Sequence, residues 1–228
     1  MQLREAACGY LKRRFPLEYD PKKELLITVG GSEAIDIAIR SLVEPGDEVL
    51  VVEPSFVCYT PITELTGGVP VPIATRAEDA FRLTPEQLKA AITPRTKLLI
   101  LPFPNNPTGA VMRRAHLEAI AGVLRGTGIM VLSDEIYAEL TYGDERHISF
   151  AEIDGMKERT ILGQGFSKSY AMTGWRLGYA AGPAPVINQM TKLHQFSIMC
   201  APTTSQYAAV EALRNGDADI EEMRGQYD

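Results

Sequence analysis

Short apolar runs alternate with amphipathic segments along almost the whole chain, and this alternation constrains its fold most strongly. Buried strands are predicted at Leu25–Val29, Val49–Val52, Val69–Ile73, Lys97–Leu101, Ile129–Leu132, Thr160–Leu162 and Leu177–Ala180. Helices are predicted at 32–43, 57–66, 84–92, 114–125, 184–197, 202–214 and 217–226. This order is typical of an α/β protein of three layers, in which helices cover both faces of one sheet.

Composition narrows the class of protein further. The 228 residues are 45% hydrophobic and 23% charged, which excludes disordered and fibrous chains and suffices for a buried core. The net charge of −6 argues against nucleic acid and anionic membrane surfaces as partners. The three cysteines are scattered, so we expect no disulfide framework and no metal site. With no apolar leader or membrane span recognised, a cytoplasmic location is predicted.

In α/β sheets, ligands usually lie in the loops beyond the carboxyl ends of the strands. The first such loop, Gly30-Gly31-Ser32-Glu33, leads directly into a helix. Two glycines allow close backbone approach, and free amides at a helix N-terminus suit an anion such as phosphate. An ordinary glycine turn with Ser32 as the helix cap is the alternative.

The loop after the fourth strand, Pro102–Gly109, is rich in proline and contains adjacent asparagines. Asn106 precedes Pro107, which restricts its backbone and aims its amide in few directions. A rigid turn would explain the prolines but does not require both asparagines. We also predict cis peptide bonds before Pro54 and Pro107.

Two further loops carry charge at predicted strand ends. Asp134 ends a strongly apolar strand, and its carboxylate needs a cationic or hydrogen-bonding partner unless it only caps a helix. The segment Gly165–Tyr179 places Lys168 and Arg176 among small and aromatic residues. Exclusion of water by such neighbours would favour the neutral, nucleophilic form of the lysine amine.

Taken in order, these motifs resemble those of the class I/II aminotransferases, pyridoxal-phosphate enzymes of fold type I. The matching segments are Gly-Gly-Ser-Glu-Ala (30–34), Asn-Asn-Pro-Thr-Gly (105–109), Ser-Asp-Glu-Ile-Tyr (133–137) and Ser-Lys-Ser-Tyr-x-Met-x-Gly-Trp-Arg-Leu-Gly (167–178). The resemblance implies a large cofactor domain built on a seven-stranded, mostly parallel sheet with one antiparallel strand.

The resemblance also implies roles for single residues. Lys168 would form the Schiff base with pyridoxal phosphate, and Asp134 would pair with the pyridinium nitrogen. Tyr137 and Asn106 would hydrogen-bond the phenolic oxygen, and Phe56 would lie against the ring. The residues implied to hold the phosphate, through backbone amides or side chains, are Gly31, Ser32, Glu33, Ser167 and Arg176.

The implied reaction moves an amino group between an amino acid and a 2-oxo acid, in a homodimer. Residues 1–214 would form the cofactor-binding domain, and 215–228 the start of a connection to a small domain that is absent. Arg214 and Arg224 lie in the wrong context for the arginine that holds the substrate carboxylate in relatives. A cofactor-binding fragment or sensor without turnover therefore stays open as an alternative. A β-elimination lyase or carbon–sulfur synthase on the same fold also stays open, because such enzymes share the cofactor cradle and differ in their substrate contacts.

The remaining polar candidates are predicted to be structural. His116, His147 and His194 are far apart in helical or polar contexts, so surface positions are expected. The charge-rich segment 217–228 is predicted to be a solvated helix. Cys58, although near Phe56, is expected to be a packed side chain and not a nucleophile.

Overall fold

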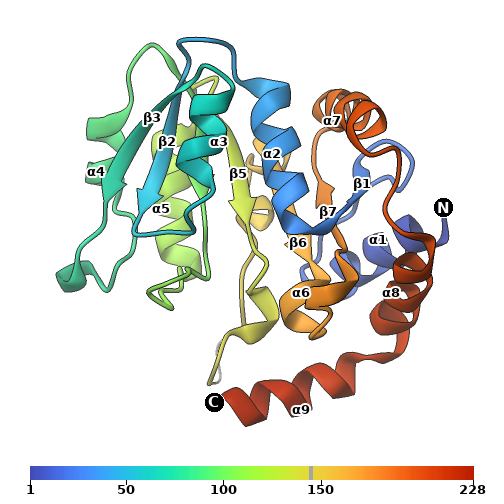
Figure 1. Ribbon diagram of the computed structural model, residues 1–228. Coiled ribbons are helices and arrows are strands. Elements are labelled where there is room, and N and C mark those ends of the chain that lie inside the picture. The colour runs from blue at the N-terminus through green and yellow to red at the C-terminus, as the bar shows by residue number, and fades with distance from the viewer. Residues whose placement is uncertain (144–145) are drawn as a thin grey trace.

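A computed structural model describes residues 1–143 and 146–228 (Figure 1). Its strands are β1 (Leu25–Thr28), β2 (Glu48–Glu53), β3 (Val69–Ala74), β4 (Thr96–Leu101), β5 (Met130–Asp134), β6 (Thr160–Gly165) and β7 (Gly178–Ala181). Its α-helices are α1 (Gln2–Arg14), α2 (Gly30–Leu42), α3 (Tyr59–Leu65), α4 (Pro85–Ala91), α5 (Arg114–Leu124), α6 (Phe166–Ser169), α7 (Ala184–Ser197), α8 (Thr203–Asn215) and α9 (Asp217–Tyr227). Short 3₁₀ turns include η2 (Ala138–Leu140) and η3 (Phe150–Glu152).

All seven strands join one sheet in the order β1-β7-β6-β5-β4-β2-β3. The pairs from β6 through β5, β4 and β2 to β3 are parallel, whereas β7 runs antiparallel to both β1 and β6. The predicted three-layer α/β fold with a mostly parallel seven-stranded sheet is confirmed. Because β7 runs the other way, it begins at the edge where its neighbour β6 ends, with Gly165 opposite Gly178.

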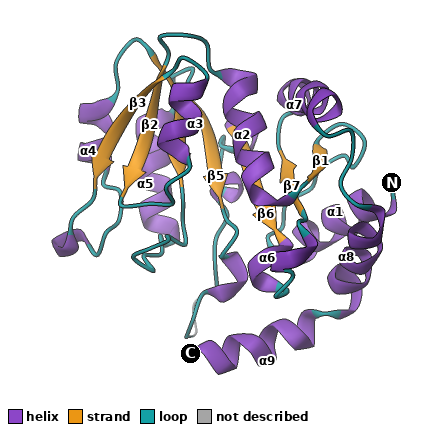
Figure 2. Ribbon diagram, in the orientation of Figure 1, coloured by secondary structure: helices purple, strands orange, loops and turns teal. Residues whose placement is uncertain are grey.

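Helices cover both faces of the sheet (Figure 2). Apolar side chains of α2, α3 and α7 pack on one face, in a core that includes Ile37, Tyr59 and Met190. Those of α4 and α5 pack on the other face, and α1 and α8 cover its β1–β7 end. The central strands are buried on both sides, as parallel strands between helical layers must be.

Local signals account for several boundaries. Oγ1 of Thr84 accepts a hydrogen bond from the backbone amide of Gln87, and Oε1 of Gln87 accepts one from the backbone amide of Thr84, so α4 begins with a capping box. The helix predicted at 57–66 is shorter, Tyr59–Leu65. The segment 217–228 is largely a solvated helix as expected, with Ile220 its buried anchor.

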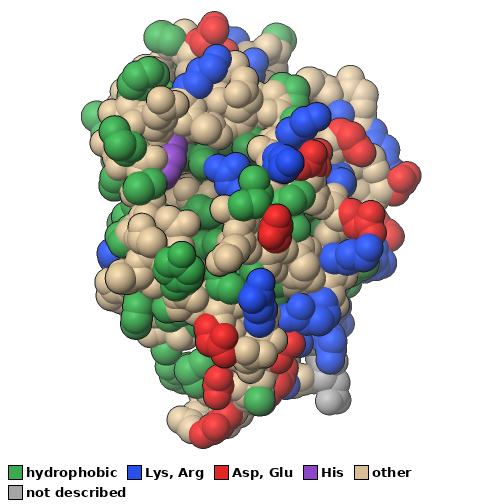
Figure 3. All heavy atoms as spheres, turned by 90° about the vertical axis from the view of Figure 1, so that its right-hand side faces the viewer, with side chains coloured by type: hydrophobic (Ala, Val, Ile, Leu, Met, Phe, Trp, Pro, Cys, Tyr) green, Lys and Arg blue, Asp and Glu red, His purple; other side chains and the backbone are tan. Residues whose placement is uncertain are grey.

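Within the described residues, no helix is long and apolar enough to cross a membrane. On the face in Figure 3, basic and acidic side chains are interspersed, so this face carries no broad patch of one sign.

Candidate active site

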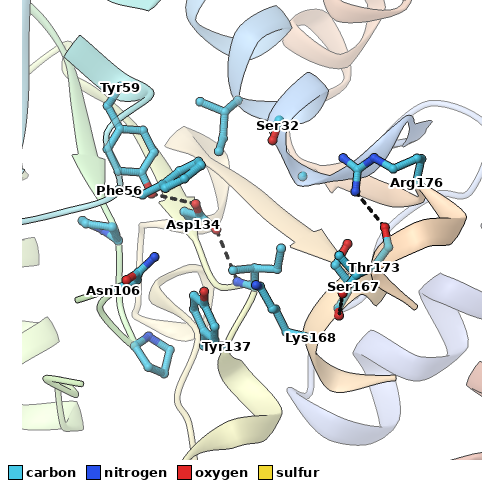
Figure 4. A pocket seen from close by; sticks show the side chains of 15 residues that line it. Ser32, Phe56, Tyr59, Asn106, Asp134, Tyr137, Ser167, Lys168, Thr173 and Arg176 are labelled. Atoms are coloured by element: carbon cyan, nitrogen blue, oxygen red, sulfur yellow. Dashed lines mark hydrogen bonds between the residues drawn. The ribbon is translucent and has the colours of Figure 1, made fainter. Parts of the chain in front are cut away.

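A cavity of about 190 Å³ opens at the carboxyl ends of the central strands (Figure 4). Loops that follow β1, β2, β4, β5 and β6, together with the segment that leads into β7, contribute its lining. The lining includes nine of the sequence-predicted residues: Gly31, Ser32, Phe56, Asn106, Asp134, Tyr137, Ser167, Lys168 and Arg176. Residues up to 145 positions apart in sequence (31 and 176) therefore share one site, because the parallel strands end and the antiparallel β7 begins at the same edge of the sheet.

Asp134 forms the acidic end of the cavity. Its Oδ2 accepts a hydrogen bond from the Tyr59 hydroxyl at 2.7 Å, and its Oδ1 accepts one from the Ile136 amide at 3.3 Å. Burial raises the pKa of Asp134, and the Tyr59 hydrogen bond opposes that rise. Tyr59 is itself only 1% exposed, and it lies outside the motifs that predicted the other site residues. A tyrosine at the start of a helix gives no local signal that its hydroxyl contacts the end of a strand 75 residues away.

Lys168, Tyr137 and Asn106 face the middle of the cavity in Figure 4. Lys168 lies in the short helix α6, and its Nζ is 5.5 Å from the centre of the Tyr137 ring. The sequence suggested that its neighbours would exclude water, but Lys168 is exposed. The reason is that Thr173–Arg176 beside it are themselves exposed and leave the cavity open.

The opposite end of the cavity is a basic cradle, formed by Gly30, Gly31, Ser32, Ser167 and Arg176. Gly30 has φ +78°, and a Cβ there would lie 2.4 Å from Nη2 of Arg176, so glycine lets the guanidinium approach the first turn of α2. Arg176 adopts a left-handed backbone conformation (φ 50°), and its Nη1 donates to the Thr173 carbonyl at 3.0 Å. Helix amides and a guanidinium together suit a phosphate group.

The structure places the Glu33 side chain elsewhere. It is absent from the cavity lining, and its carboxylate lies 2.7 Å from Nδ1 of His194 and accepts the Val29 amide. A carboxylate turned away from the cradle avoids repelling an anion there. Only the backbone of Glu33 can therefore contribute to this end of the cavity.

The prediction that the histidines occupy surface positions is wrong for two of them. His194 is 6% exposed because α7 packs on α2, where Glu33 provides its partner. The His147 side chain is 8% exposed, and its Nε2 lies 2.7 Å from Oε2 of the buried Glu135. Neither histidine lines the cavity. Each ring points inward toward a carboxylate on another segment, Glu135 for His147 and Glu33 for His194, which local context could not indicate.

Phe56 lies at the cavity wall, edge-on to Tyr59, with ring centres 6.1 Å apart. Burial, with the charge of Asp134, raises the pKa of the Cys58 thiol to about 12, which agrees with a packed and unreactive side chain. The peptide bonds before Pro54 and Pro107 are cis as predicted, and the bond before Pro104 is cis as well. Among the described residues, no group of three or more His, Cys, Asp and Glu could hold a metal.

Taken together, the cavity has a carboxylate at one end, an amine in the middle and a cradle for an anion at the other. This donor set suits pyridoxal phosphate, which carries a ring nitrogen, an aldehyde and a phosphate. A Cβ at Gly30 would occupy the space that Arg176 uses in this cradle.

Comparison with known proteins agrees with this class of site. The family model for aminotransferase class I and II matches residues 1–228. The chain therefore belongs to the class I and II aminotransferases, a pyridoxal-phosphate-dependent family. It is 49% identical over 225 residues to the putative aminotransferase YugH of Bacillus subtilis, covering 99% of this chain and 58% of that one. It is 43% identical to an aspartate aminotransferase of Pyrococcus abyssi, covering 100% of this chain and 59% of that one.

Solved structures show the same likeness. The crystal structure of an aromatic aminotransferase from Pyrococcus horikoshii has a TM-score of 0.96 and 43% identity, covering 99% of this chain and 61% of that one. The chain thus spans about three fifths of the length of these relatives.

Proposed function

We propose that this chain is the cofactor-binding part of an aminotransferase that moves an amino group between an amino acid and a 2-oxo acid. The observation that carries the proposal is the arrangement of Lys168, Asp134 and Arg176 around one cavity. An amine, a carboxylate and a guanidinium are the groups that the aldehyde, ring nitrogen and phosphate of the cofactor require.

When bound, pyridoxal phosphate supplies an aldehyde that condenses with amines and a ring that accepts electrons. The Nζ of Lys168 would bind it and, once displaced by the substrate amine, would take the proton from the substrate Cα. Asp134 would keep the ring nitrogen protonated, while Tyr137 and Asn106 would hydrogen-bond the phenolic oxygen. Arg176, Ser167 and the backbone at Gly31 to Glu33, with the Ser32 side chain, would anchor the phosphate, and Phe56 would cover one ring face.

Borohydride reduction followed by peptide mapping tests the proposal. Reduction makes the bond between the amine and the cofactor permanent, so the cofactor mass should be found on the peptide that contains Lys168. The matched control is Lys192→Ala, which removes an exposed lysine of α7 that pairs with Gln189 outside the cavity. Label that survives Lys168→Ala, or that lies on another lysine, would contradict the assignment.

A second assay separates the reaction types that this cofactor site could serve. An aminotransferase converts a 2-oxo acid to its amino acid in step with loss of the amino donor, whereas a β-elimination lyase releases ammonia. We expect transfer without ammonia release from the protein that carries this chain. Ammonia release without transfer would favour the lyase.

We further propose that residues 1–214 form the cofactor domain, that 215–228 begin a connection to a small domain, and that the protein is a cytoplasmic homodimer. Large apolar side chains exposed near the end of α7 and on α8 support self-association, among them Phe196 (86% exposed), Met199 (76%) and Tyr207 (66%). Sedimentation at several concentrations tests the dimer, and a monomer throughout would exclude it.

A further inference from the structure

A second carboxylate lies directly beside Asp134 but faces away from the cavity. Glu135 is 1% exposed and does not line the cavity. Successive side chains at a strand end point to opposite faces, so Asp134 reaches the site while Glu135 enters the protein interior. A buried carboxylate is costly unless hydrogen bonds compensate it, so its partners indicate what it is for.

Glu135 accepts an unusually full set of hydrogen bonds. Its Oε1 accepts the hydroxyls of Ser133 at 2.7 Å and Ser149 at 2.9 Å, and also the Phe150 amide at 3.1 Å. Its Oε2 lies 2.7 Å from Nε2 of His147. Ser133, Ser149 and the His147 side chain are each at most 8% exposed. The carboxylate thus joins the end of β5 to the segment 147–150.

The backbone of Glu135 is also fixed, both at its amide and at its carbonyl. Its amide donates to the Gly163 carbonyl of β6 at 2.9 Å, which extends the strand pairing one residue past Asp134. Its carbonyl accepts the Ala138 amide at 2.9 Å, which closes the turn that contains Tyr137. A movement of Glu135 would therefore move both Asp134 and Tyr137.

We propose that Glu135, held by Ser133, His147 and Ser149, is a positioning residue that fixes the turn presenting Asp134 and Tyr137 to the cofactor. The inference rests on the proposed function, because it assigns the turn a cofactor to face. In support, the charge of Glu135 also contributes to raising the pKa of Asp134, after the larger effect of burial.

The anchoring segment is well suited to hold a turn in place. Ser149 accepts the Ala151 amide at 3.3 Å, and its own amide donates to the Glu152 carboxylate at 2.9 Å, which caps η3. The ring of Phe15 from the end of α1 packs edge-on against His147, with centres 5.9 Å apart. The contacts that hold Glu135 are therefore themselves held by η3 and by the end of α1, which lie outside the cavity lining.

The test measures two properties of the full chain: its dissociation constant for pyridoxal phosphate and the visible absorption band of the bound cofactor. Glu135→Gln removes the charge at nearly constant shape. His147→Leu removes the donor, whereas His147→Gln retains an N–H near the position of Nε2. Thr160→Val is the control for lost stability, because it removes a buried hydroxyl that donates to the Met156 carbonyl at 2.7 Å at the far end of β6.

We expect Glu135→Gln and His147→Leu to raise the dissociation constant at least about tenfold, as loss of one hydrogen bond to a charged group would, and to shift the absorption band. His147→Gln should remain close to wild type, and Thr160→Val should lower the melting temperature without changing the affinity or the band. If Glu135→Gln does not fold, the two His147 variants decide. Two results would show a role in stability alone and overturn the proposal. In the first, both His147 variants have the affinity and spectrum of wild type. In the second, the affinity of every variant, Thr160→Val included, falls in proportion to its melting temperature.

The wild-type protein separates this outcome from failure of the proposed function. If wild type does not bind pyridoxal phosphate, the proposed function fails and the inference fails with it. If wild type binds and the variants bind equally well, only the positioning role is overturned.

Discussion

Removing the Tyr59 hydroxyl should change how strongly Asp134 holds its proton. In Tyr59→Phe, Asp134 Oδ2 loses its 2.7 Å hydrogen bond and keeps its buried surroundings. A hydrogen bond to a charged group contributes about 1.5–3 kcal/mol, and about 1.4 kcal/mol corresponds to one pKa unit. We therefore expect the pKa of Asp134, already raised by burial, to rise by about 1–2 further units.

The sign of the effect on stability follows from linkage. The pKa of Asp134 is higher in the folded chain than in the unfolded chain, so its contribution to stability is present at acid pH. That contribution is lost as pH rises through the folded pKa. Because Tyr59→Phe raises this pKa, the variant should lose more stability at neutral pH than at acid pH.

Urea unfolding of the cofactor-free chain over a pH series measures this difference. The matched control is Tyr179→Phe, since the buried Tyr179 hydroxyl has no hydrogen-bond partner among the described residues. Its removal should leave the free energy of unfolding unchanged or slightly higher at every pH. A loss in Tyr59→Phe that is equal at all pH values, or equal to that of Tyr179→Phe, would refute the coupling between Tyr59 and Asp134.

Three other substitutions test the phosphate cradle, with its control, and a helix cap. Gly30→Ala should weaken binding of pyridoxal phosphate about tenfold, since its Cβ would displace Arg176 and cost a charge-assisted hydrogen bond. Gly126→Ala has the same φ of +78° with nothing within 4 Å of the added Cβ, so it should lower stability but not affinity, and equal affinity loss in both would contradict the argument. Thr84→Ala should lower the free energy of unfolding by about 1 kcal/mol in urea melts through loss of the capping box, and an unchanged midpoint would show that the cap contributes nothing.

The fold was largely predictable because its signals are local. The apolar run predicted at Lys97–Leu101 corresponds to β4 at Thr96–Leu101, and each of the other predicted strands overlaps an observed one, although Thr160–Leu162 covers only the first half of β6. The order of the strands in the sheet could not be predicted from these local signals, because β7 lies between β1 and β6 and its pairing with β1 joins segments distant in sequence. The four-residue helix α6, which carries Lys168, is too short to produce a helical periodicity.

For the site, loop chemistry predicted nine of the residues that line the cavity, but it missed Tyr59, which also lines it, and Glu135, which lies behind it. Lys168 and Asn106 are exposed in the segments that follow β6 and β4, where their polar groups stand out in the sequence. Tyr59 and Glu135 are buried, and their side chains depend on partners such as Asp134 and His147 that the folded chain brings near.

The division between these two groups has a physical cause. A side chain that contacts a ligand must remain accessible, and its polar group then stands out in a loop of the sequence. A supporting side chain must be buried to be rigid, and burial requires that each of its polar atoms find a partner. The four groups that donate hydrogen bonds to the Glu135 carboxylate meet that requirement, whereas a residue retained for apolar packing alone would have no need of them. Buried polar residues adjacent in sequence to a predicted site residue are therefore the positions where a structure adds most to what motifs reveal.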